Sequence, residues 1–186
     1  MVQFFWKYLL WLMKYKSYYL LCLVLVILDQ LTKQIVVSLF ALGESMVINS
    51  YLSWTYIQNT GAAFSILSGG GAIQKAFLLG VSLFVSAMVM VWIHKTPAIR
   101  RQRLFGQFLL LSGALGNLLD RAQYGYVVDF IDVHYQNYYW PVFNVADSLI
   151  FIGVILILFE RRQPALWNFS INNLAGVSII DLTGRI

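Results

Sequence analysis

Four long apolar segments constrain this chain more than any other feature of its sequence. A hydrocarbon core of about 30 Å is crossed by roughly 20 apolar residues in a helix. Segments of this kind run over residues 18–40, 76–93, 104–123 and 140–159. Only 11% of the residues are charged, whereas a soluble domain contains about 25%. The sequence therefore predicts a multi-pass, mainly helical membrane protein with four transmembrane helices.

Basic residues beside these segments predict the orientation of the helices. Nine of the thirteen lysine and arginine residues fall on one side of a four-helix hairpin arrangement: Lys7, Lys14, Lys16, Lys95, Arg100, Arg101, Arg103, Arg161 and Arg162. The positive-inside rule makes that side cytoplasmic, so both termini are expected inside and the connections 41–75 and 124–139 outside. Short basic clusters of this kind indicate topology, and no nucleic-acid partner is expected.

The organisation around the helices is predicted from local patterns. Residues 1–17 interleave aromatic side chains with lysines, which is typical of a segment lying at the membrane surface. Residues 18–162 form the predicted four-helix membrane domain, and the tail 163–186 receives no role. Met46–Ile57 has strand-like patterning. The predicted fold class is thus all-α and polytopic, with a small extracytoplasmic β-rich loop region.

Polar residues near the predicted outer face form the main functional hypothesis. An ionisable group in a membrane segment costs from about 2.5 kcal/mol upward at the bilayer centre, so each one needs a reason. The helix directions and the outer loops bring the following residues to one level: Asp29, Lys33, Asn117, Asp120, Arg121, Asp129, Asp132, Asn144 and Asp147. A structural ion pair explains Asp29 and Lys33, four residues apart, as well as a functional site does. Taken alone, Asn59-Thr60-Gly61 is typical of a simple turn.

The candidate reactive groups near the predicted outer face are carboxylates. The sequence has no interpretable serine and histidine pair, zinc-ligand spacing or phosphate-binding glycine loop, so neither a metal nor a cofactor is expected. Two aspartates close together do not both ionise easily, so one keeps its proton while the other is charged. Such a pair supplies an acid and a base for the attack of water on an amide.

Five sequence blocks resemble a known family, the lipoprotein signal peptidases or signal peptidase II. They are DQLTK (29–33), QNTGAAFS (58–65), GALGNLLDR (113–121), VVDFID (127–132) and FNVADS (143–148). Each block alone is a weak signal, but together they occur in the order typical of the family. The resemblance covers about residues 18–162.

The resemblance implies a bacterial inner-membrane aspartyl endopeptidase. Membrane lipids are its expected surroundings, and a monomer is expected. Its implied substrates are diacylglyceryl-modified prolipoproteins, cut immediately before the lipidated cysteine. By the family pattern, Asp129 and Asp147 are the catalytic pair and Asp132 lies outside it. Residues implied to bind substrate or support the pair are Asp29, Lys33, Asn59, Gly61, Asn117, Asp120, Arg121 and Asn144.

Three further hypotheses remain open at this stage. A small proton- or ion-coupled transporter also places Asp and Lys on facing helices, although it is expected to carry charge through the whole membrane. A membrane scaffold uses polar groups only to join helices. Within the peptidase hypothesis, an outer loop with Trp54, Tyr56 and Phe64 could form a lid, hinged at the glycines 69–71.

Overall fold

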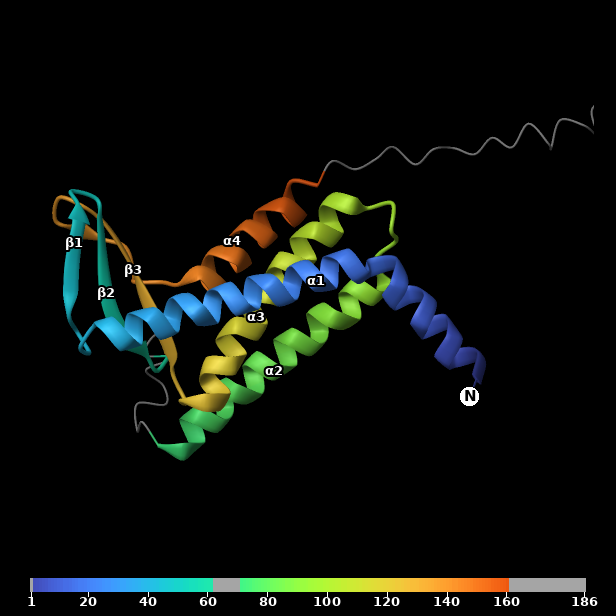
Figure 1. Ribbon diagram of the computed structural model, residues 1–186, viewed down its shortest axis with the longest axis horizontal. Helices are drawn as coiled ribbons and strands as arrows, with labels where there is room; N and C mark the ends of the chain where they lie inside the picture. Colours follow the sequence, from blue (N-terminus) through green and yellow to red (C-terminus); the bar gives the residue numbers. More distant parts are fainter. Residues whose placement is uncertain (1, 62–70, 161–186) are drawn as a thin grey trace, which may run out of the picture.

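Helices form the body of the protein, and a small sheet lies across one end of it (Figure 1). The computed structural model describes residues 2–61 and 71–160, with side chains from Tyr15 onward. The helices of the described part are α1 (Val2–Leu39), α2 (Ala72–Lys95), α3 (Arg101–Gln123) and α4 (Val145–Leu158). Its strands are β1 (Ser45–Asn49), β2 (Leu52–Asn59), β3 (Val127–Tyr135) and β4 (Tyr138–Tyr139). They form an antiparallel sheet in the order β1-β2-β3-β4.

The helices have the surface of a membrane protein. Within the described residues, Tyr15–Leu39 and Ala72–Lys95 are long and apolar enough to cross a membrane, and Val145–Leu158 is apolar but shorter. Large apolar side chains on α1 and α2, such as Leu31 and Phe84, are exposed on the outside of the bundle. Such surface suits lipid better than water. These observations support the prediction of a membrane protein. Of the four predicted spans, two are confirmed as helices long and apolar enough to cross a membrane within the described residues.

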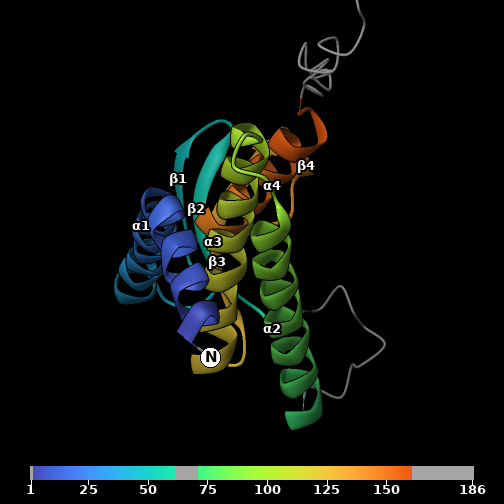
Figure 2. The ribbon, with the colours of Figure 1, turned by 90° about the vertical axis from the view of Figure 1, so that its right-hand side faces the viewer.

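Helix α3 lies at the centre of the bundle and packs against each of the other three helices (Figure 2). Its contact with α4 is close because both helices carry glycine. A Cβ atom added to Gly106 would lie 2.8 Å from the Gly153 carbonyl oxygen, and one on Gly153 would lie 2.6 Å from the Gly106 oxygen. Small residues allow this backbone approach between membrane helices. The half of α4 away from the sheet is thereby held against α3.

An apolar cluster joins the sheet to the helices. Val36 of α1, Tyr56 of β2 and Val128 and Phe130 of β3 are buried together. Strand β3 thus lies under α1 with its first four residues buried. This packing fixes the position of Asp129 within that stretch of β3.

The sheet corrects two sequence-based expectations and confirms a third. The fold is not all-α with a β-rich loop, because β3 occupies 127–135, where an outer loop was expected, and pairs with β2. The fourth helix begins at Val145 and not at 140, since Phe143 pairs with Ile131 and Asn144 caps the helix. Strands over 46–57 are confirmed.

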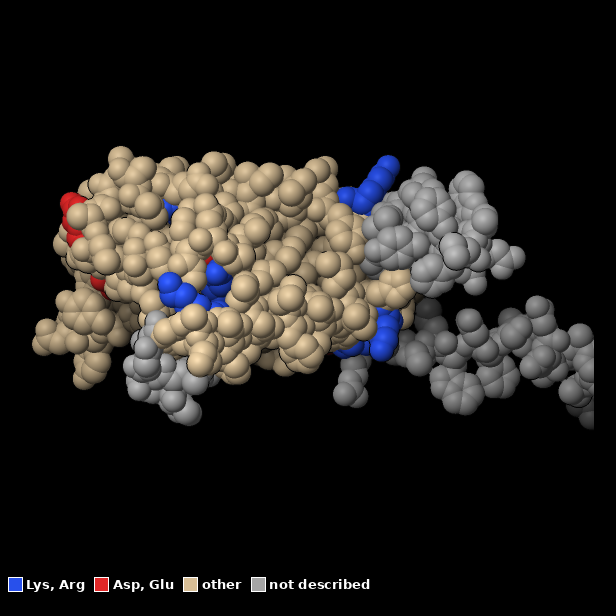
Figure 3. Space-filling view, turned by 90° about the horizontal axis from the view of Figure 1, so that it is seen from below, with Lys and Arg blue, Asp and Glu red and all other residues tan. Residues whose placement is uncertain are grey.

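Charge is distributed unevenly along the bundle. Lysine and arginine show at the end away from the sheet and in a second group toward the sheet end, where acidic side chains also show (Figure 3). At the basic end, Glu160 pairs with Arg103 at 2.6 Å and with Arg100 at 3.7 Å. The start of α1, the α2–α3 connection and the end of α4 all lie at this end (Figure 1).

Candidate active site

The polar residues singled out in the sequence meet where the sheet-side ends of α1, α3 and α4 reach β3. Helix α1 supplies Asp29 and Lys33, α3 supplies Asn117, Asp120 and Arg121, β3 supplies Asp129, and the start of α4 supplies Asn144 and Asp147. Most of these side chains are buried: Asp29, Lys33, Asn117, Asp120, Asp129 and Asn144. Asp147 and Arg121 are half-buried. The predicted convergence at one level is therefore observed.

The cap of α4 holds Asp129 and Asp147 together. The Asn144 side-chain oxygen accepts a hydrogen bond from the Asp147 backbone N–H at 2.9 Å, and the Asp147 carboxylate accepts one from the Asn144 N–H at 3.2 Å. This is a reciprocal capping box, which satisfies two free donors at a helix start. The remaining group of Asn144, its side-chain amide, donates to Asp129 Oδ1 at 2.6 Å. A helix cap is thus also the link between the two aspartates.

Asn117 forms a second link behind the same pair. Its amide Nδ2 donates to Asp147 Oδ1 at 2.8 Å. Its oxygen accepts from Asn144 Nδ2 at 3.2 Å and from Lys33 Nζ at 3.1 Å. The orientation of the Asp147 carboxylate is therefore set from α3 as well as from its own helix.

Lys33 is the buried cation of the site. Its ammonium lies 2.8 Å from Asp29 Oδ2 and 3.0 Å from Asp120 Oδ2. Asp29 Oδ1 accepts from the Ala146 N–H at 2.8 Å, and Asp120 Oδ2 accepts from the Val128 N–H at 3.0 Å. The ion pairs thus connect α1 to α3, α4 and β3. Removing one partner from such a cluster leaves an uncompensated buried charge.

Asn59 and Gly61 approach Asp129 from the end of β2. Asn59 Nδ2 donates to Asp129 Oδ2 at 2.9 Å, while Asn59 Oδ1 accepts from the Gly61 N–H at 2.9 Å. Gly61 has a φ of 75°, a conformation that glycine adopts readily. The segment is thus both a turn and a contact to Asp129.

Arg121 faces the acidic residues from the last turn of α3. Its guanidinium interacts electrostatically with Asp147, Asp129 and Asp120. Its Nη1 donates to the Asn117 carbonyl oxygen at 3.4 Å. The remaining N–H donors of this half-buried side chain are suited to binding a carbonyl or carboxylate.

Burial raises the pKa of Asp129 to about 6. Hydrogen bonds from Asn59 and Asn144 act in the opposite direction, and the nearby charge of Asp147 raises the pKa further. Asp129 therefore exchanges its proton near neutral pH, which is the range that a general acid or base requires.

Several residues lie differently from expectation or were not identified from the sequence. Gln30 joins the site, since its amide donates to Asp120 Oδ1 at 2.8 Å and to the Gly116 carbonyl at 3.2 Å. Its sequence signals were its place beside Asp29 and its position in the block DQLTK (29–33). Asp132 lies apart and accepts from Thr55 at 3.0 Å.

The structure also bears on the hypothesis of a lid that contains Trp54, Tyr56 and Phe64. Tyr56 is buried in the core between the sheet and α1, so it is unavailable to a movable lid. Trp54 is exposed on β2. Phe64 and the glycines 69 and 70 lie outside the described residues, as does the tail 163–186.

Comparison with known proteins identifies the chain. Residues 21–161 match the signal peptidase (SPase) II family. The lipoprotein signal peptidase of Pseudoalteromonas translucida (strain TAC 125) is 44% identical over 140 residues, covering 75% of this chain and 84% of that protein. The lipoprotein signal peptidase of Ralstonia nicotianae (strain ATCC BAA-1114 / GMI1000) is 41% identical over 138 residues, covering 74% and 79%.

The fold is also found among solved structures. A bacterial membrane enzyme solved by the in meso method at 1.9 Å resolution has a TM-score of 0.68 and 37% identity, covering 77% of this chain and 90% of that one. Fold and sequence together define a membrane-bound protease of bacterial type. The chain belongs to the signal peptidase II family.

Proposed function

We propose that this protein is an aspartic endopeptidase that removes the signal peptide from diacylglyceryl-modified prolipoproteins, cutting immediately before the lipidated cysteine. Asp129 and Asp147 are the catalytic pair. The observation that carries the proposal is their shared contact with Asn144, whose amide binds Asp129 and whose backbone N–H binds Asp147. Family membership supports the substrate class.

The reaction uses one ionised and one protonated aspartate. The ionised carboxylate takes a proton from water while the water oxygen attacks the peptide carbonyl carbon. The protonated aspartate donates to the developing oxyanion. As the carbon–nitrogen bond breaks, the leaving amine receives a proton from the aspartate that took one from water. Because the pKa of Asp129 is raised to about 6, both protonation states of this residue are accessible near neutral pH.

The surrounding residues support the pair or bind the substrate. Asn117 and Asn144 orient the two carboxylates, and Asn59 donates to the Asp129 oxygen that Asn144 does not contact. Gly61 provides the turn that places Asn59. Arg121 binds a backbone carbonyl of the substrate beside the cleavage site, because it has free donors directed at this region.

The ion-paired residues act as a frame. Lys33 pairs with Asp29 and Asp120, and these carboxylates accept backbone N–H groups of α4 and β3. The frame thereby fixes the elements that carry Asp147 and Asp129. Its residues need no contact with the substrate.

The proposed topology has four spans, both termini in the cytoplasm and the aspartates near the outer face of the bacterial inner membrane. The basic residues at the end opposite the sheet support this orientation. Residues 18–162 form the membrane peptidase domain, preceded by the interfacial segment 1–17 and followed by the tail 163–186. The protein acts as a monomer surrounded by lipid.

The substrate class explains the depth of the site. Acyl chains on the lipidated cysteine remain in the bilayer, so the adjacent peptide bond lies near the outer interface. The catalytic pair, on β3 and at the outer end of α4, lies at the same level. A transporter, in contrast, requires charge along the membrane path, and Glu160 at the opposite end is already paired with Arg103.

Cleavage of a diacylglyceryl-modified prolipoprotein by folded variants tests the proposal. Asp129→Asn and Asp147→Asn are each expected to lose about 10²- to 10⁴-fold in rate, the usual contribution of a general acid or base. Asp132→Asn is the matched control, since Asp132 lies on the same strand but contacts Thr55. Full activity of either dyad variant would remove that residue from the catalytic pair.

A further inference from the structure

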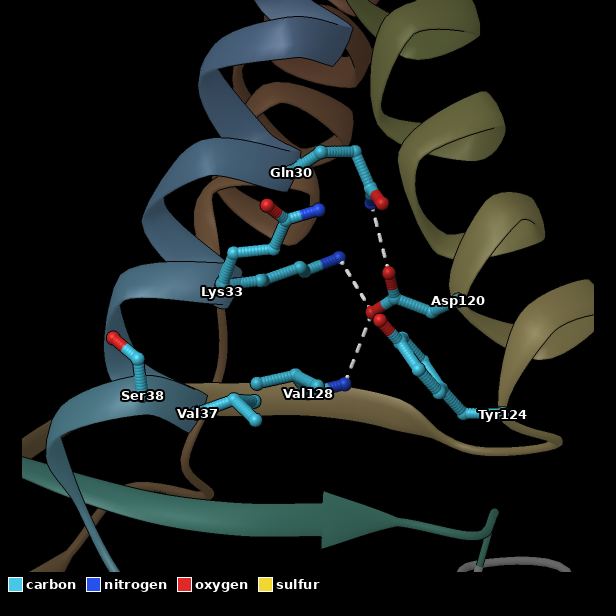
Figure 4. A pocket seen from close by; sticks show the side chains of 8 residues that line it. Gln30, Lys33, Val37, Ser38, Asp120, Tyr124 and Val128 are labelled. Carbon is cyan, nitrogen blue, oxygen red and sulfur yellow. Dashed lines mark hydrogen bonds and ion pairs between the residues drawn. The ribbon is translucent and has the colours of Figure 1, made fainter.

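A small pocket opens on the side of β3 that faces away from the catalytic pair. Its volume is about 130 Å³, and it lies between the outer end of α1, the end of α3 and β3 (Figure 4). The lining residues are Gln30, Lys33, Gln34, Val37, Ser38, Asp120, Tyr124 and Val128. Val128 and Asp129 are neighbours in a strand, so their side chains point to opposite faces. The pocket is therefore separate from the cleavage site.

The base of the pocket carries negative charge. Lys33 and Asp120 lie there, and both are buried. Together with Asp29 they carry two carboxylates and one ammonium, a sum of −1 when all are ionised. The Arg121 guanidinium also interacts with Asp120, but more strongly with Asp147 and Asp129. The three N–H donors of Lys33 are directed at Asp29, Asp120 and Asn117. No donor of Lys33 is left for an anion, so the pocket does not suit a phosphate.

Hydrogen-bond acceptors line the remaining walls. Asp120 Oδ1 accepts one bond, from Gln30, and retains capacity for another. The Ser38 hydroxyl donates its hydrogen within α1 at 2.8 Å, which leaves its oxygen as an acceptor. Gln34 also lines the pocket and has a side-chain carbonyl, and Tyr124 points toward Asp120 from the end of α3 (Figure 4). An aromatic ring beside several acceptors favours a cation with N–H donors.

The apolar surface beside the rim of the pocket indicates that such a cation belongs to a lipid. Gln34, Val37 and Ser38 are exposed on α1, and the adjoining side chains Ile35 and Leu39 present apolar surface. The pocket thus opens beside the apolar surface of a membrane helix, near its outer end. Its volume corresponds to about four water molecules at roughly 30 Å³ each, enough for an ammonium with a short carbon stem.

We propose that this pocket binds the primary ammonium of a phospholipid headgroup, as in phosphatidylethanolamine, between Asp120, Gln34 and Tyr124. The three N–H donors of the headgroup bind the acceptors, while its acyl chains lie along α1. A quaternary ammonium has no N–H donor and fits poorly. The binding is a second function of the chain, in a pocket that shares Lys33 and Asp120 with the frame.

Lipid retention in nanodiscs tests this directly. The protein is placed in discs of phosphatidylglycerol mixed with phosphatidylethanolamine, its mono- and dimethyl derivatives or phosphatidylcholine, and retained lipid is counted by native mass spectrometry. We expect about tenfold preference for phosphatidylethanolamine over phosphatidylcholine, falling with each added methyl group. Equal retention of the two lipids would overturn the proposal.

Three variants locate the binding. Gln34→Lys places a tethered ammonium at the rim, and Tyr124→Leu removes the ring; both are expected to abolish the preference. Val47→Lys adds the same charge at an exposed position on β1, outside the lining, and is expected to retain it. A preference unchanged in Gln34→Lys and Tyr124→Leu would place the lipid elsewhere. Soluble ethanolamine that binds in phosphatidylcholine discs as strongly as the lipid would overturn the assignment to a headgroup.

Discussion

Asn144 Nδ2 lies 2.6 Å from Asp129 Oδ1, so the residue that caps α4 also holds an aspartate of the neighbouring strand. The same side chain therefore caps the start of α4 and positions Asp129 of the proposed catalytic pair. A substitution that keeps the cap but removes the amide separates these two roles.

Asn144→Ser is expected to keep the cap and lose activity. Serine caps helices about as well as asparagine, whereas alanine at this position costs about 0.5–2 kcal/mol. The serine hydroxyl is too short to replace the amide that reaches Asp129. We expect a rate reduced by at least about 10². The unfolding midpoint should fall less than in Asn144→Ala, because the cap is kept while the buried acceptors of the amide lose a donor. Cleavage assays and thermal scans measure the two effects. Asn144→Ala should lower both, and wild-type turnover in Asn144→Ser would contradict the role of the amide.

Lys33→Met is expected to destabilise the fold strongly. Asp29 and Asp120 would then lie buried without their cation, and breaking a buried pair costs about 3–5 kcal/mol. A denaturant titration of the purified protein measures the loss. Arg100→Met is the control, because Arg100 is partly exposed and lies 3.7 Å from Glu160, where a pair contributes at most about 1 kcal/mol. Equal losses in both variants would refute the framing role of Lys33.

Gly113→Ala is expected to move the first turn of α4. The added Cβ would clash with the Ala146 carbonyl oxygen and lie 2.7 Å from Ile150 Cγ1. Such overpacking costs about 1–3 kcal/mol, and here it also displaces Asp147. Gly80→Ala is the matched control, since no atom lies within 4 Å of its added Cβ. The cleavage rate and the unfolding midpoint should fall in Gly113→Ala and stay unchanged in Gly80→Ala. If both variants behave alike, the close approach of α3 to α4 at Gly113 is not needed.

The pH dependence of stability should report Asp129. Its pKa rises from 3.8 to about 6 in the folded protein, so between these values the folded state holds a proton that the unfolded state has released. The contribution of this group is fully present below pH 3.8 and is lost as the pH rises through about 6. Unfolding midpoints measured across this range should fall less steeply for Asp129→Asn than for the unaltered protein. Identical slopes would contradict the raised pKa.

The level of the site could be predicted because charge in a membrane segment is rare. Basic residues set the direction of each segment, and direction places Asp29, Asp120 and Asp147 at the same end of the bundle. That reasoning needs only helix rise and sequence position. It does not depend on tertiary packing.

Strand β3 could not be recognised in the same way. Residues 127–130 are buried on both faces, by the α1 side and by the site, so they lack the alternation that marks a half-buried strand. Gln30 was missed because an amide beside two charged residues carries no pattern of its own. Tyr56 was expected at the surface, yet β2 directs it into the core.

Helix α4 has 14 residues, which span only about 21 Å at 1.5 Å per residue. In the proposed topology this is shorter than the roughly 30 Å hydrocarbon layer, because the catalytic cap occupies the outer end of the helix. Lipid beside α4 must therefore thin locally to cover it, and hydrophobic mismatch of this kind costs a fraction of a kcal/mol per Å. The acyl-chain length of the surrounding bilayer then becomes a determinant of turnover, with thinner membranes favouring the protein.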